Sequence, residues 1–251
     1  MVHIVGAGPG DPELITVKGQ KYLQAADVII YAGSLVNPAL LKICKNDAAI
    51  YNSATMTLAE VVAVIEKAEQ EGKMTVRLHT GDPSVYGAIQ EQMDAFTKKG
   101  IAYDVVPGVS SCFAAAAALK QEYTLPGISQ TVIITRNEGR TPVPEMEKLR
   151  KLASHQATMC IYLSITMLDK VVAELIAGGY ADDTPIAIVQ KASWPEEKIV
   201  RGTLATIVND IADKGIDRTA MIVVSRCLGA DYELSRLYAP EFTHMFRKAS
   251  Q

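Results

Sequence analysis

The feature of this sequence that most constrains its fold is a regular alternation of short β-rich runs with amphipathic helical segments. This alternation is typical of α/β proteins, in which helices cover a largely parallel sheet. The predicted strands of the first half are residues 2–5, 27–31, 48–51, 74–79 and 103–106. Those of the second half are residues 131–135, 158–164, 185–190, 198–201 and 220–225.

Helices are predicted between these strands from caps and apolar stripes. Residues 57–60 read Thr-Leu-Ala-Glu, the spacing of a capping box, and Gly72 is expected to end the helix that follows. Four further sets of apolar residues have helical spacing. They are Leu58, Val61, Val62 and Ile65; Val85, Ile89, Met93 and Phe96; Leu168, Val171, Val172 and Leu175; and Leu204, Ile207, Val208 and Ile211.

The pattern breaks once, near the middle of the chain. An alanine run at residues 114–118 is followed by residues 121–128, which we interpret as a linker. This predicts an N-terminal α/β domain at residues 1–120 with a largely parallel sheet, and a C-terminal α/β domain at residues 129–251. The short alternating run at residues 198–201 predicts that the second sheet is mixed. We expect a ligand-binding cleft between the two domains.

Composition narrows the class of protein. Apolar residues make up 49% of the chain and charged residues 21%, as in globular proteins. A net charge of −3 gives no overall basic field for nucleic acid or an anionic membrane. No apolar run approaches the ~20 residues needed to cross a bilayer, and the first residues lack the features of a signal peptide. We therefore expect neither nucleic acid nor membrane as a partner.

The cysteines indicate a reducing compartment. Cys44, Cys112, Cys160 and Cys227 are widely separated and form no CxxC pair. Reduced thiols, no metal site and a cytoplasmic location are the expectation.

The glycine loop, residues 6–11, reads Gly-Ala-Gly-Pro-Gly-Asp between a predicted strand and a predicted helix. A dinucleotide fingerprint requires its third glycine where Asp11 stands, and a carboxylate there would repel a pyrophosphate. The second strand ends at Tyr31 without an acid to hold a ribose, and no Gly-Lys-Ser/Thr follows the loop. NAD binding is therefore disfavoured, and a tight turn that lets a backbone or ligand come close is favoured.

Four further turns are rich in Gly, Pro and small hydroxyl residues: TGDPSVYG at 80–87, VPGVSS at 106–111, ASWP at 192–195 and RTAM at 218–221. Each adjoins a predicted strand end, where α/β proteins place their sites. With the glycine loop they resemble the GxGPGD, GDP and VPGxSS signatures of the tetrapyrrole (corrin/porphyrin) methylases, over essentially the whole chain. Motifs at 31–36, 78–82, 135–142, 192–195 and 235–239 resemble one subgroup, which methylates carbon 11 of precorrin-4 or of its cobalt complex.

The resemblance implies a two-domain homodimer that binds S-adenosylmethionine between its domains and methylates a tetrapyrrole. Most cofactor contacts would come from main-chain groups and small side chains, with Asp82 as the strong polar one, while the glycine loop would face the substrate side. The positions that match the family's cofactor contacts are Pro9, Gly81, Asp82, Val85, Ser110, Ser111, Leu163, Ala192, Ala220 and Met221.

Methyl transfer from a sulfonium to carbon mainly requires two partners held ~3–3.5 Å apart without water. A corrin precursor carries acetate and propionate carboxylates, which Arg can bind through two parallel hydrogen bonds. The substrate-binding candidates beside predicted loops are Arg136, Arg140, Arg77 and Lys18. For each of them, an ordinary surface charge is the alternative interpretation.

The chain departs from the related uroporphyrinogen methylases, for which an Asp and a Lys after the second and third strands are proposed to move a proton. Here residues 31–34 and 51–54 read Tyr-Ala-Gly-Ser and Tyr-Asn-Ser-Ala. This argues against uroporphyrinogen as substrate and leaves the base unassigned, with Tyr31, His79, water and a carboxylate of the substrate as candidates. Trp194 either packs against the ring or anchors the domain.

Other functions stay open. The same fold could methylate another ring position or a different acceptor, such as a modified translation-factor histidine. An oxidoreductase that binds a dinucleotide and a non-catalytic cofactor-binding module are further alternatives. The sequence does not distinguish a cobalt-loaded from a metal-free ring.

Overall fold

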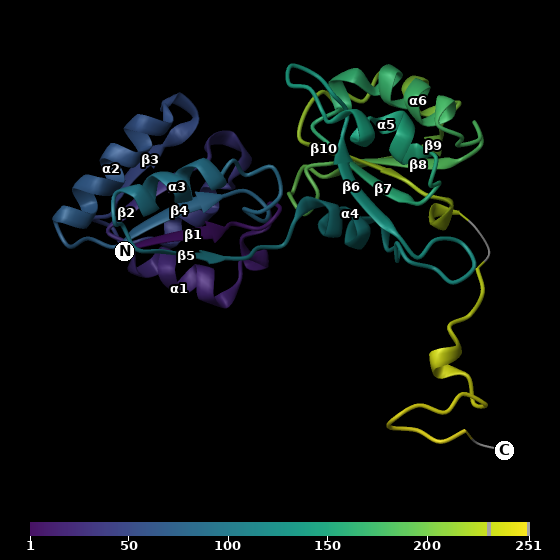
Figure 1. Ribbon diagram of the computed structural model, residues 1–251, viewed down its shortest axis with the longest axis horizontal. Helices are drawn as coiled ribbons and strands as arrows, with labels where there is room; N and C mark the ends of the chain where they lie inside the picture. Colours follow the sequence, from purple (N-terminus) through teal and green to yellow (C-terminus); the bar gives the residue numbers. More distant parts are fainter. Residues whose placement is uncertain (230–231, 250–251) are drawn as a thin grey trace. The chain divides into compact units, whose positions relative to one another are not determined.

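The structure, a computed structural model, describes residues 1–229 and 232–249, and for Ser34 and Arg236 it describes the main chain alone. The side chains of Ser34 and Arg236, which belong to the predicted motifs at 31–36 and 235–239, therefore lie outside the description. The chain divides into two compact units (Figure 1). The first contains Met1–Ala115 and Lys191–Glu197, and the second contains Ala116–Gln190 and Lys198–Gln251.

The boundary between the units falls inside α4 (Ser111–Leu119). The predicted linker, residues 121–128, belongs to the second unit and lacks regular secondary structure. Tyr123 and Leu125 in it are buried, and the Tyr123 carbonyl accepts a hydrogen bond of 2.8 Å from the Thr158 hydroxyl. Burial of these side chains explains why the segment packs with the second unit.

The first unit is built on a parallel five-stranded sheet of order β3-β2-β4-β1-β5. Its strands are β1 (Val2–Gly6), β2 (Val28–Tyr31), β3 (Ala49–Asn52), β4 (Thr75–His79) and β5 (Tyr103–Val106), which confirms the predicted strands. Figure 1 shows α1 (Val17–Ala25) on one face and α2 (Leu58–Gln70) with α3 (Gln90–Lys98) on the other. Separate apolar clusters fill the two faces.

The start of α2 confirms the capping box. The Thr57 hydroxyl accepts from the Glu60 amide at 3.3 Å, and the Glu60 carboxylate accepts from the Thr57 amide at 2.7 Å. Val61, Val62 and Ile65 are buried, whereas Leu58 is 38% exposed, so the buried stripe begins one turn later than predicted. Gly72, with a φ of +66°, follows the helix as predicted.

The predicted start of the next helix was wrong. The apolar stripe begins at Val85, but α3 begins at Gln90. Before it, Tyr86 and Ala88 have positive φ values of 56° and 49°, which no helix accommodates. Gly87 lies against the Pro83 carbonyl so closely that a side chain there would overlap it. The residues before α3 therefore form a turn. Val85 and Ile89 lie in it, and their spacing in the sequence matches that of the apolar residues in the helix that follows.

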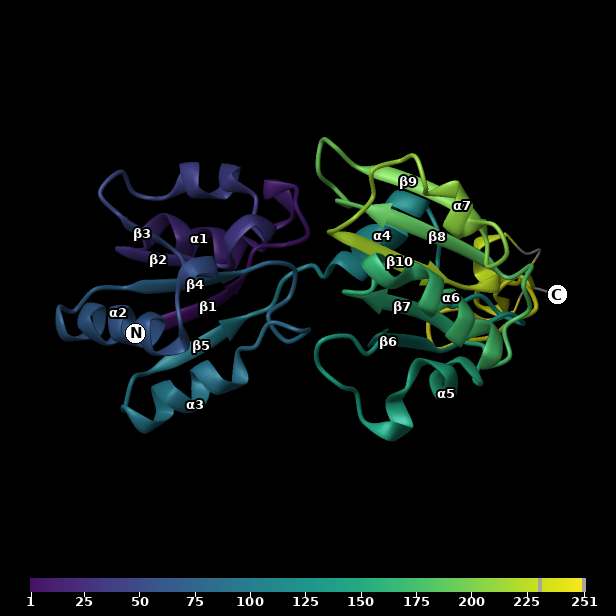
Figure 2. The ribbon, with the colours of Figure 1, turned by 90° about the horizontal axis from the view of Figure 1, so that it is seen from above.

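The second unit contains a mixed sheet of order β6-β7-β10-β8-β9, as predicted. Its strands are β6 (Val132–Arg136), β7 (Thr158–Tyr162), β8 (Pro185–Gln190), β9 (Lys198–Thr203) and β10 (Ala220–Val224). Only β6 and β7 pair in parallel. The helices α5 (Leu149–Ala153), α6 (Leu168–Ala177) and α7 (Ile207–Asp210) pack on the sheet around one apolar core (Figure 2).

Two helices of the second unit differ from the prediction. The helix expected over residues 204–211 is reduced to α7, because the amides of Leu204 and Ala205 bond to the carbonyls of Thr184 and Asp182 instead. The short α5 was not predicted at all. The 3₁₀ turns are Pro12–Leu14, Gly33–Leu35, Pro38–Ile43, Ser53–Thr55, Glu145–Glu147, Ile165–Met167, Arg226–Leu228 and Arg236–Tyr238.

Candidate active site

Three of the predicted turns meet at one edge of the first sheet. β4, β1 and β5 are neighbours and run parallel, so the segments that follow them leave from the same carboxyl edge. The amide of Gly81 donates to the carbonyl of Gly8 at 2.8 Å, and the amide of Gly8 donates back at 3.3 Å. The glycine loop and the turn at 80–87 are therefore joined by main-chain pairing.

Glycines allow this close approach. A methyl group at Gly6 would lie 2.7 Å from the Cα of Gly108 and 2.7 Å from the carbonyl oxygen of Gly81. A methyl group at Gly108 would overlap the same carbonyl. Main-chain atoms surround both positions and cannot swing aside as a side chain could. The carboxyl edge is thus a surface of tightly packed backbone.

The carboxylate of Asp82 connects two of these turns. Its Oδ2 accepts from the Gly108 amide at 2.9 Å, and its Oδ1 accepts from the amide of Ser84 at 2.9 Å and from the Ser84 hydroxyl. Partial burial raises the pKa of Asp82, but the hydrogen bonds from Ser84 and Gly108 outweigh that effect and leave the pKa below its ordinary value. Sequence reasoning missed both partners, although the Asp-x-Ser spacing is typical of an Asx turn.

The other predicted cofactor positions of the first unit line the same turns. Ser110 is buried directly before α4, and Ser111 begins that helix. A side chain at Gly81, which has a φ of +59°, would approach the Ser110 Cα at 3.7 Å. Val85 follows Asp82 within its turn and is half-buried.

Pro9 and Ala192 lie in two segments that touch each other within the first unit. The indole nitrogen of Trp194 donates to the Pro9 carbonyl at 2.9 Å, and the amide of Asp11 donates to the Ser193 hydroxyl at 3.0 Å. Ala192 is 4% exposed. Trp194 therefore anchors this unit, one of the two roles that the sequence allowed.

In the second unit, the predicted positions share one edge of the mixed sheet. Leu163 directly follows β7, and Ala220 and Met221 begin β10, which pairs antiparallel with β7 and β8. Ala220 is opposite Gln190, the last residue of β8. Leu163 is 66% exposed at a φ of +53°, an unusual state for an apolar residue in a left-handed conformation.

Backbone strain is concentrated in these segments. Of the eight non-glycine residues described with positive φ, six lie in or directly beside the predicted site segments. Such residues cost about 1–3 kcal/mol each and cluster at functional sites. They are Tyr86, Ala88, Leu163, Lys191, Ser193 and Thr219. The strain marks the same turns that the sequence motifs mark.

The four substrate-binding candidates have different surroundings. Arg77 lies inside β4 rather than beside a loop and is 6% exposed. Its guanidinium donates to Gln92 Oε1 at 2.9 Å and to the Ile30 carbonyl at 3.1 Å, and burial lowers its pKa to about 10. Lys18 pairs with Asp104 at 3.4 Å. Both cations are thus engaged within the first unit.

Arg136 and Arg140 belong to the segment that follows β6. Arg136 donates to the carbonyls of Thr141 at 3.1 Å and Pro142 at 2.7 Å, which holds the loop in place. Arg140 is exposed, and within residues 1–229 and 232–249 it has no hydrogen bond or ion pair. Of the four cations, Arg140 is the one that is available to a carboxylate in the described chain.

The two base candidates end β2 and β4. Tyr31 is half-buried against the apolar cluster under α1. His79 is 4% exposed, and its Nε2 has no hydrogen-bond partner among the described residues. Burial, assisted by the charge of Arg77, lowers the pKa of His79 to about 3. The imidazole is therefore neutral and a poor proton acceptor near neutral pH.

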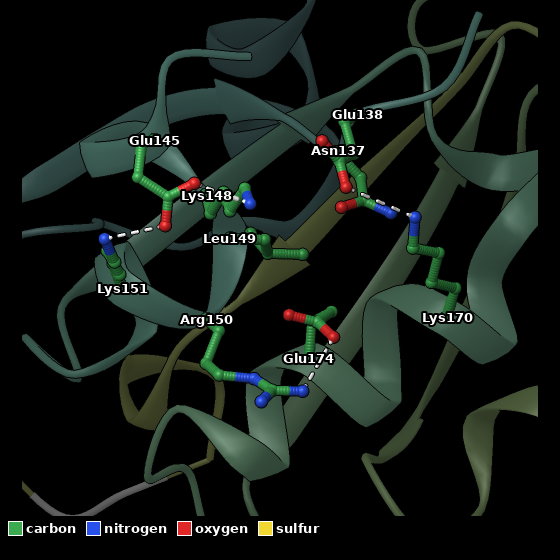
Figure 3. A pocket seen from close by; sticks show the side chains of 9 residues that line it. All are labelled: Asn137, Glu138, Glu145, Lys148, Leu149, Arg150, Lys151, Lys170 and Glu174. Atoms are coloured by element: carbon green, nitrogen blue, oxygen red, sulfur yellow. Dashed lines mark hydrogen bonds and ion pairs between the residues drawn. The ribbon is translucent and has the colours of Figure 1, made fainter. Parts of the chain in front are cut away.

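A pocket of about 330 Å³ that sequence reasoning missed opens beside the end of β6 (Figure 3). Its four cations all pair with carboxylates: Lys170 with Glu138 at 3.7 Å, Arg150 with Glu174 at 2.9 Å, and Lys148 and Lys151 with Glu145 at 2.6 and 3.0 Å. The hydrogen bonds from Lys148 and Lys151 lower the pKa of Glu145 to about 2. Two of the four cations share Glu145, and each cation of the pocket already has a carboxylate partner among the described residues.

The part of the chain that the structure describes has neither a cluster of metal ligands nor a helix that could span a membrane. In that part of the chain, no three His, Cys, Asp or Glu side chains approach one another closely enough to bind a metal ion. No helix within it has the length and apolar character to cross a bilayer. No disulfide joins Cys44, Cys112, Cys160 or Cys227.

A parallel α/β unit with a backbone-lined carboxyl edge and a mixed α/β unit with strained strand ends together define the fold of the tetrapyrrole methyltransferases. A solved structure of a cobalt precorrin-4 methyltransferase of cobalamin biosynthesis superposes with a TM-score of 0.89 at 50% identity, covering 91% of this chain and 96% of that one. The family described as Tetrapyrrole (Corrin/Porphyrin) Methylases matches residues 1–208, and the chain belongs to it.

Curated relatives share almost the full length of the chain. A cobalt-precorrin-4 C(11)-methyltransferase of Methanocaldococcus jannaschii is 60% identical over 99% of this chain and 96% of its own. A precorrin-4 C(11)-methyltransferase of Pseudomonas aeruginosa is 45% identical over 98% of both chains.

Proposed function

We propose that this protein transfers a methyl group from S-adenosylmethionine to carbon 11 of cobalt-precorrin-4 in cobalamin biosynthesis. The observation that carries the proposal is the backbone-lined carboxyl edge, where the family motifs at 6–11, 80–87 and 106–111 meet. We choose the cobalt-loaded acceptor because the relative at 60% identity and the solved structure at 50% are named for it. The Pseudomonas aeruginosa relative, which is named for precorrin-4 without cobalt, is 45% identical.

The residues present suit a nucleoside cofactor better than a dinucleotide. Enzymes of this family use S-adenosylmethionine. Gly8 and Gly108 let main-chain segments pack against each other at this edge, and at Gly81 the nearest atom to an added methyl group would be the Ser110 Cα at 3.7 Å. Asp11 accepts from the Glu13 amide at 2.9 Å, so a carboxylate already stands where a pyrophosphate would need to bind.

We assign the cofactor contacts to both units. When bound, S-adenosylmethionine supplies a methyl group on a positively charged sulfur that leaves readily. In the first unit the contacts would come from the turns that Asp82 ties together, and in the second from the strand ends at Leu163 and β10. The proposed residues are Pro9, Gly81, Asp82, Val85, Ser110, Ser111, Leu163, Ala192, Ala220 and Met221.

In this reaction the protein mainly has to position the methyl donor and the acceptor. A displacement at carbon needs donor and acceptor held at ~3–3.5 Å in line, with water excluded. Rigid backbone at Gly6, Gly81 and Gly108 provides a surface that does not yield when ligands bind. Besides its proposed contact with the cofactor, Asp82 has a positioning role, because both of its oxygens accept hydrogen bonds from the protein.

Recognition of the acid-rich ring is assigned to local cations. Arg140, free in the described chain, is our first candidate for direct contact with a carboxylate. Arg136 would act through the loop that it holds. For Arg77 and Lys18, which already have protein partners, we propose a contribution to the local positive charge.

The proton that leaves the ring needs an acceptor, which we assign either to the protein or to the substrate. His79 is disfavoured by its burial and by its pKa of about 3. Tyr31, at the carboxyl end of β2, and a carboxylate of the substrate are the proposed proton acceptors.

The resemblance also supports a homodimer that acts in the cytoplasm, and four cysteines without a disulfide are consistent with a reducing compartment. Sedimentation equilibrium of the purified chain would test the dimer, and a mass equal to one chain at micromolar concentration would refute it.

Calorimetry tests the proposed cofactor. S-adenosylhomocysteine, the demethylated cofactor, is expected to bind with micromolar affinity, while NAD under the same conditions is expected not to bind. Binding of NAD without binding of S-adenosylhomocysteine would replace this proposal with that of a dinucleotide-dependent oxidoreductase.

A further inference from the structure

The segment Lys191–Glu197, which we call the Trp194 clasp, connects β8 to β9 and packs in the first unit. Its own bonds make it rigid. The amide of Trp194 donates to the Lys191 carbonyl at 2.9 Å, and the amide of Ser193 donates to the Glu197 carboxylate at 2.7 Å. Lys191 and Ser193 have positive φ values of 49° and 71°. Strain at two non-glycine residues indicates that the surrounding structure enforces this shape.

The clasp holds every residue of the second half of the glycine loop. Trp194 Nε1 donates to the Pro9 carbonyl at 2.9 Å, and Ser193 accepts from the Asp11 amide at 3.0 Å. Between them, Gly10 lies directly under the indole, and a side chain at Gly10 would overlap the ring. No other residue type fits at Gly10 unless Trp194 moves.

The first half of the loop is fixed independently of the clasp. Gly8 pairs with Gly81 through two main-chain hydrogen bonds, and Gly6 packs against Gly108. Of the positions assigned to the cofactor, those around Asp82 and Ser110 therefore depend on contacts that do not include Trp194, whereas Pro9 and Ala192 adjoin it. Only residues 9–11 of the loop contact the clasp, and the Asn37 side chain also donates to the Gly10 carbonyl at 2.8 Å.

We propose that Trp194 is a positioning residue for the tetrapyrrole acceptor. Its clasp fixes residues 9–11 at the carboxyl edge of the first sheet, where they would form one wall of the acceptor site. This inference rests on the proposed function. Ligands of parallel α/β sheets bind beyond the carboxyl ends of the strands, which is where this wall stands. A shift of residues 9–11 would weaken binding of the acceptor and leave the turns around Asp82 and Ser110 in place.

Two variants separate the acceptor from the cofactor. Trp194→Phe removes the hydrogen bond to Pro9 and keeps an aromatic ring, and Gly10→Ala displaces the indole. Both are expected to raise KM for cobalt-precorrin-4 about tenfold or more, with a smaller change in kcat. The Kd for S-adenosylhomocysteine is expected to rise clearly less than this KM, because only Pro9 and Ala192 of the assigned cofactor contacts adjoin the indole, while Gly8 and Gly81 remain paired.

Trp194 is the only tryptophan of the chain, so its fluorescence reports on the clasp directly. The emission of Gly10→Ala is expected to shift to longer wavelength as the indole is displaced toward water. Gly229→Ala is the matched control, since a methyl group there meets only Pro185 at 3.8 Å. Ser193→Ala, which removes a single hydrogen bond, is the mild variant if the others fold poorly, and it is expected to raise KM several-fold.

A wild-type KM in Trp194→Phe and Ser193→Ala would overturn the role of the clasp, as would an equal loss of acceptor and cofactor binding. Failure of the wild-type protein to bind S-adenosylhomocysteine would instead refute the proposed function, so the two failures are distinguishable.

Discussion

At the scale of single residues, Asp82 was expected to contact the cofactor, and in the structure it makes hydrogen bonds within the protein. Its type and position suggested a polar group for the cofactor, yet both carboxylate oxygens accept protein hydrogen bonds. The Asx turn with Ser84 is readable from the spacing, whereas the bond to Gly108 joins residues 26 positions apart and is not. Only the folded sheet brings those two turns together.

Removal of this carboxylate tests its role. In Asp82→Ala, the Gly108 amide loses its partner, and we expect a loss of about 1–3 kcal/mol in the free energy of unfolding. Since the cofactor turns separate, S-adenosylhomocysteine should bind about tenfold more weakly. Urea unfolding and calorimetry measure the two effects. Ser84→Ala, which leaves the Gly108 bond intact, is the control, and equal affinities for both variants would refute the role of Asp82.

His79 predicts a pH dependence of stability. Its folded pKa of about 3 lies below the ordinary value of 6.5, so as the pH falls below 6.5 the unfolded chain takes up a proton that the folded chain does not. The stability associated with the neutral ring is therefore complete above pH 6.5 and is lost as the pH falls toward 3.

In His79→Leu, the unfolded chain no longer takes up a proton at this position. The plot of unfolding free energy against pH should be less steep than that of the wild type, by up to about 1.4 kcal/mol per pH unit. Urea unfolding between these limits measures the slope. Identical slopes in the two proteins would show that His79 is hydrated and titrates normally in the folded state.

At the scale of elements, the packing of three turns determines what the first sheet can bind. Gly6→Ala would place a methyl group 2.7 Å from the backbone of Gly108 and Gly81. We expect a destabilisation of about 1–3 kcal/mol and the loss of measurable S-adenosylhomocysteine binding, because the turns must move apart.

Gly100→Ala is the matched control for this element. No atom lies within 4 Å of the added methyl group, and only the φ of +67° is unfavourable. It should cost about 1 kcal/mol and leave cofactor binding unchanged. Circular dichroism melts and calorimetry compare the two variants, and similar binding by both would contradict the importance of the glycine contacts.

The elements also show where sequence reasoning succeeds. The strands of both sheets follow from short β-rich runs, and α2 follows from its capping box, because these signals are local. The lengths of α3 and α7 were wrong because apolar periodicity continues into turns. Positive φ at Tyr86 and Ala88 stops one helix, and bonds to the loop at 182–184 stop the other.

At the scale of the whole molecule, the site residues were identified from motifs rather than from contacts. The structure brings the motifs of the first unit together at one sheet edge and those of the second at another. It also shows that Arg77 is buried, which its place in an apolar strand indicated only indirectly. The clasp of Trp194 on the glycine loop joins residues 185 positions apart and has no local signal.

The most direct test of the account is methyl transfer itself. The purified protein is incubated with cobalt-precorrin-4 and S-adenosylmethionine that carries a ¹³C-labelled methyl group, in parallel with metal-free precorrin-4. We predict a product with one added methyl group, located at carbon 11 by NMR, formed faster from the cobalt-loaded ring. A labelled methyl group at another ring carbon, or no transfer to either ring, would contradict it.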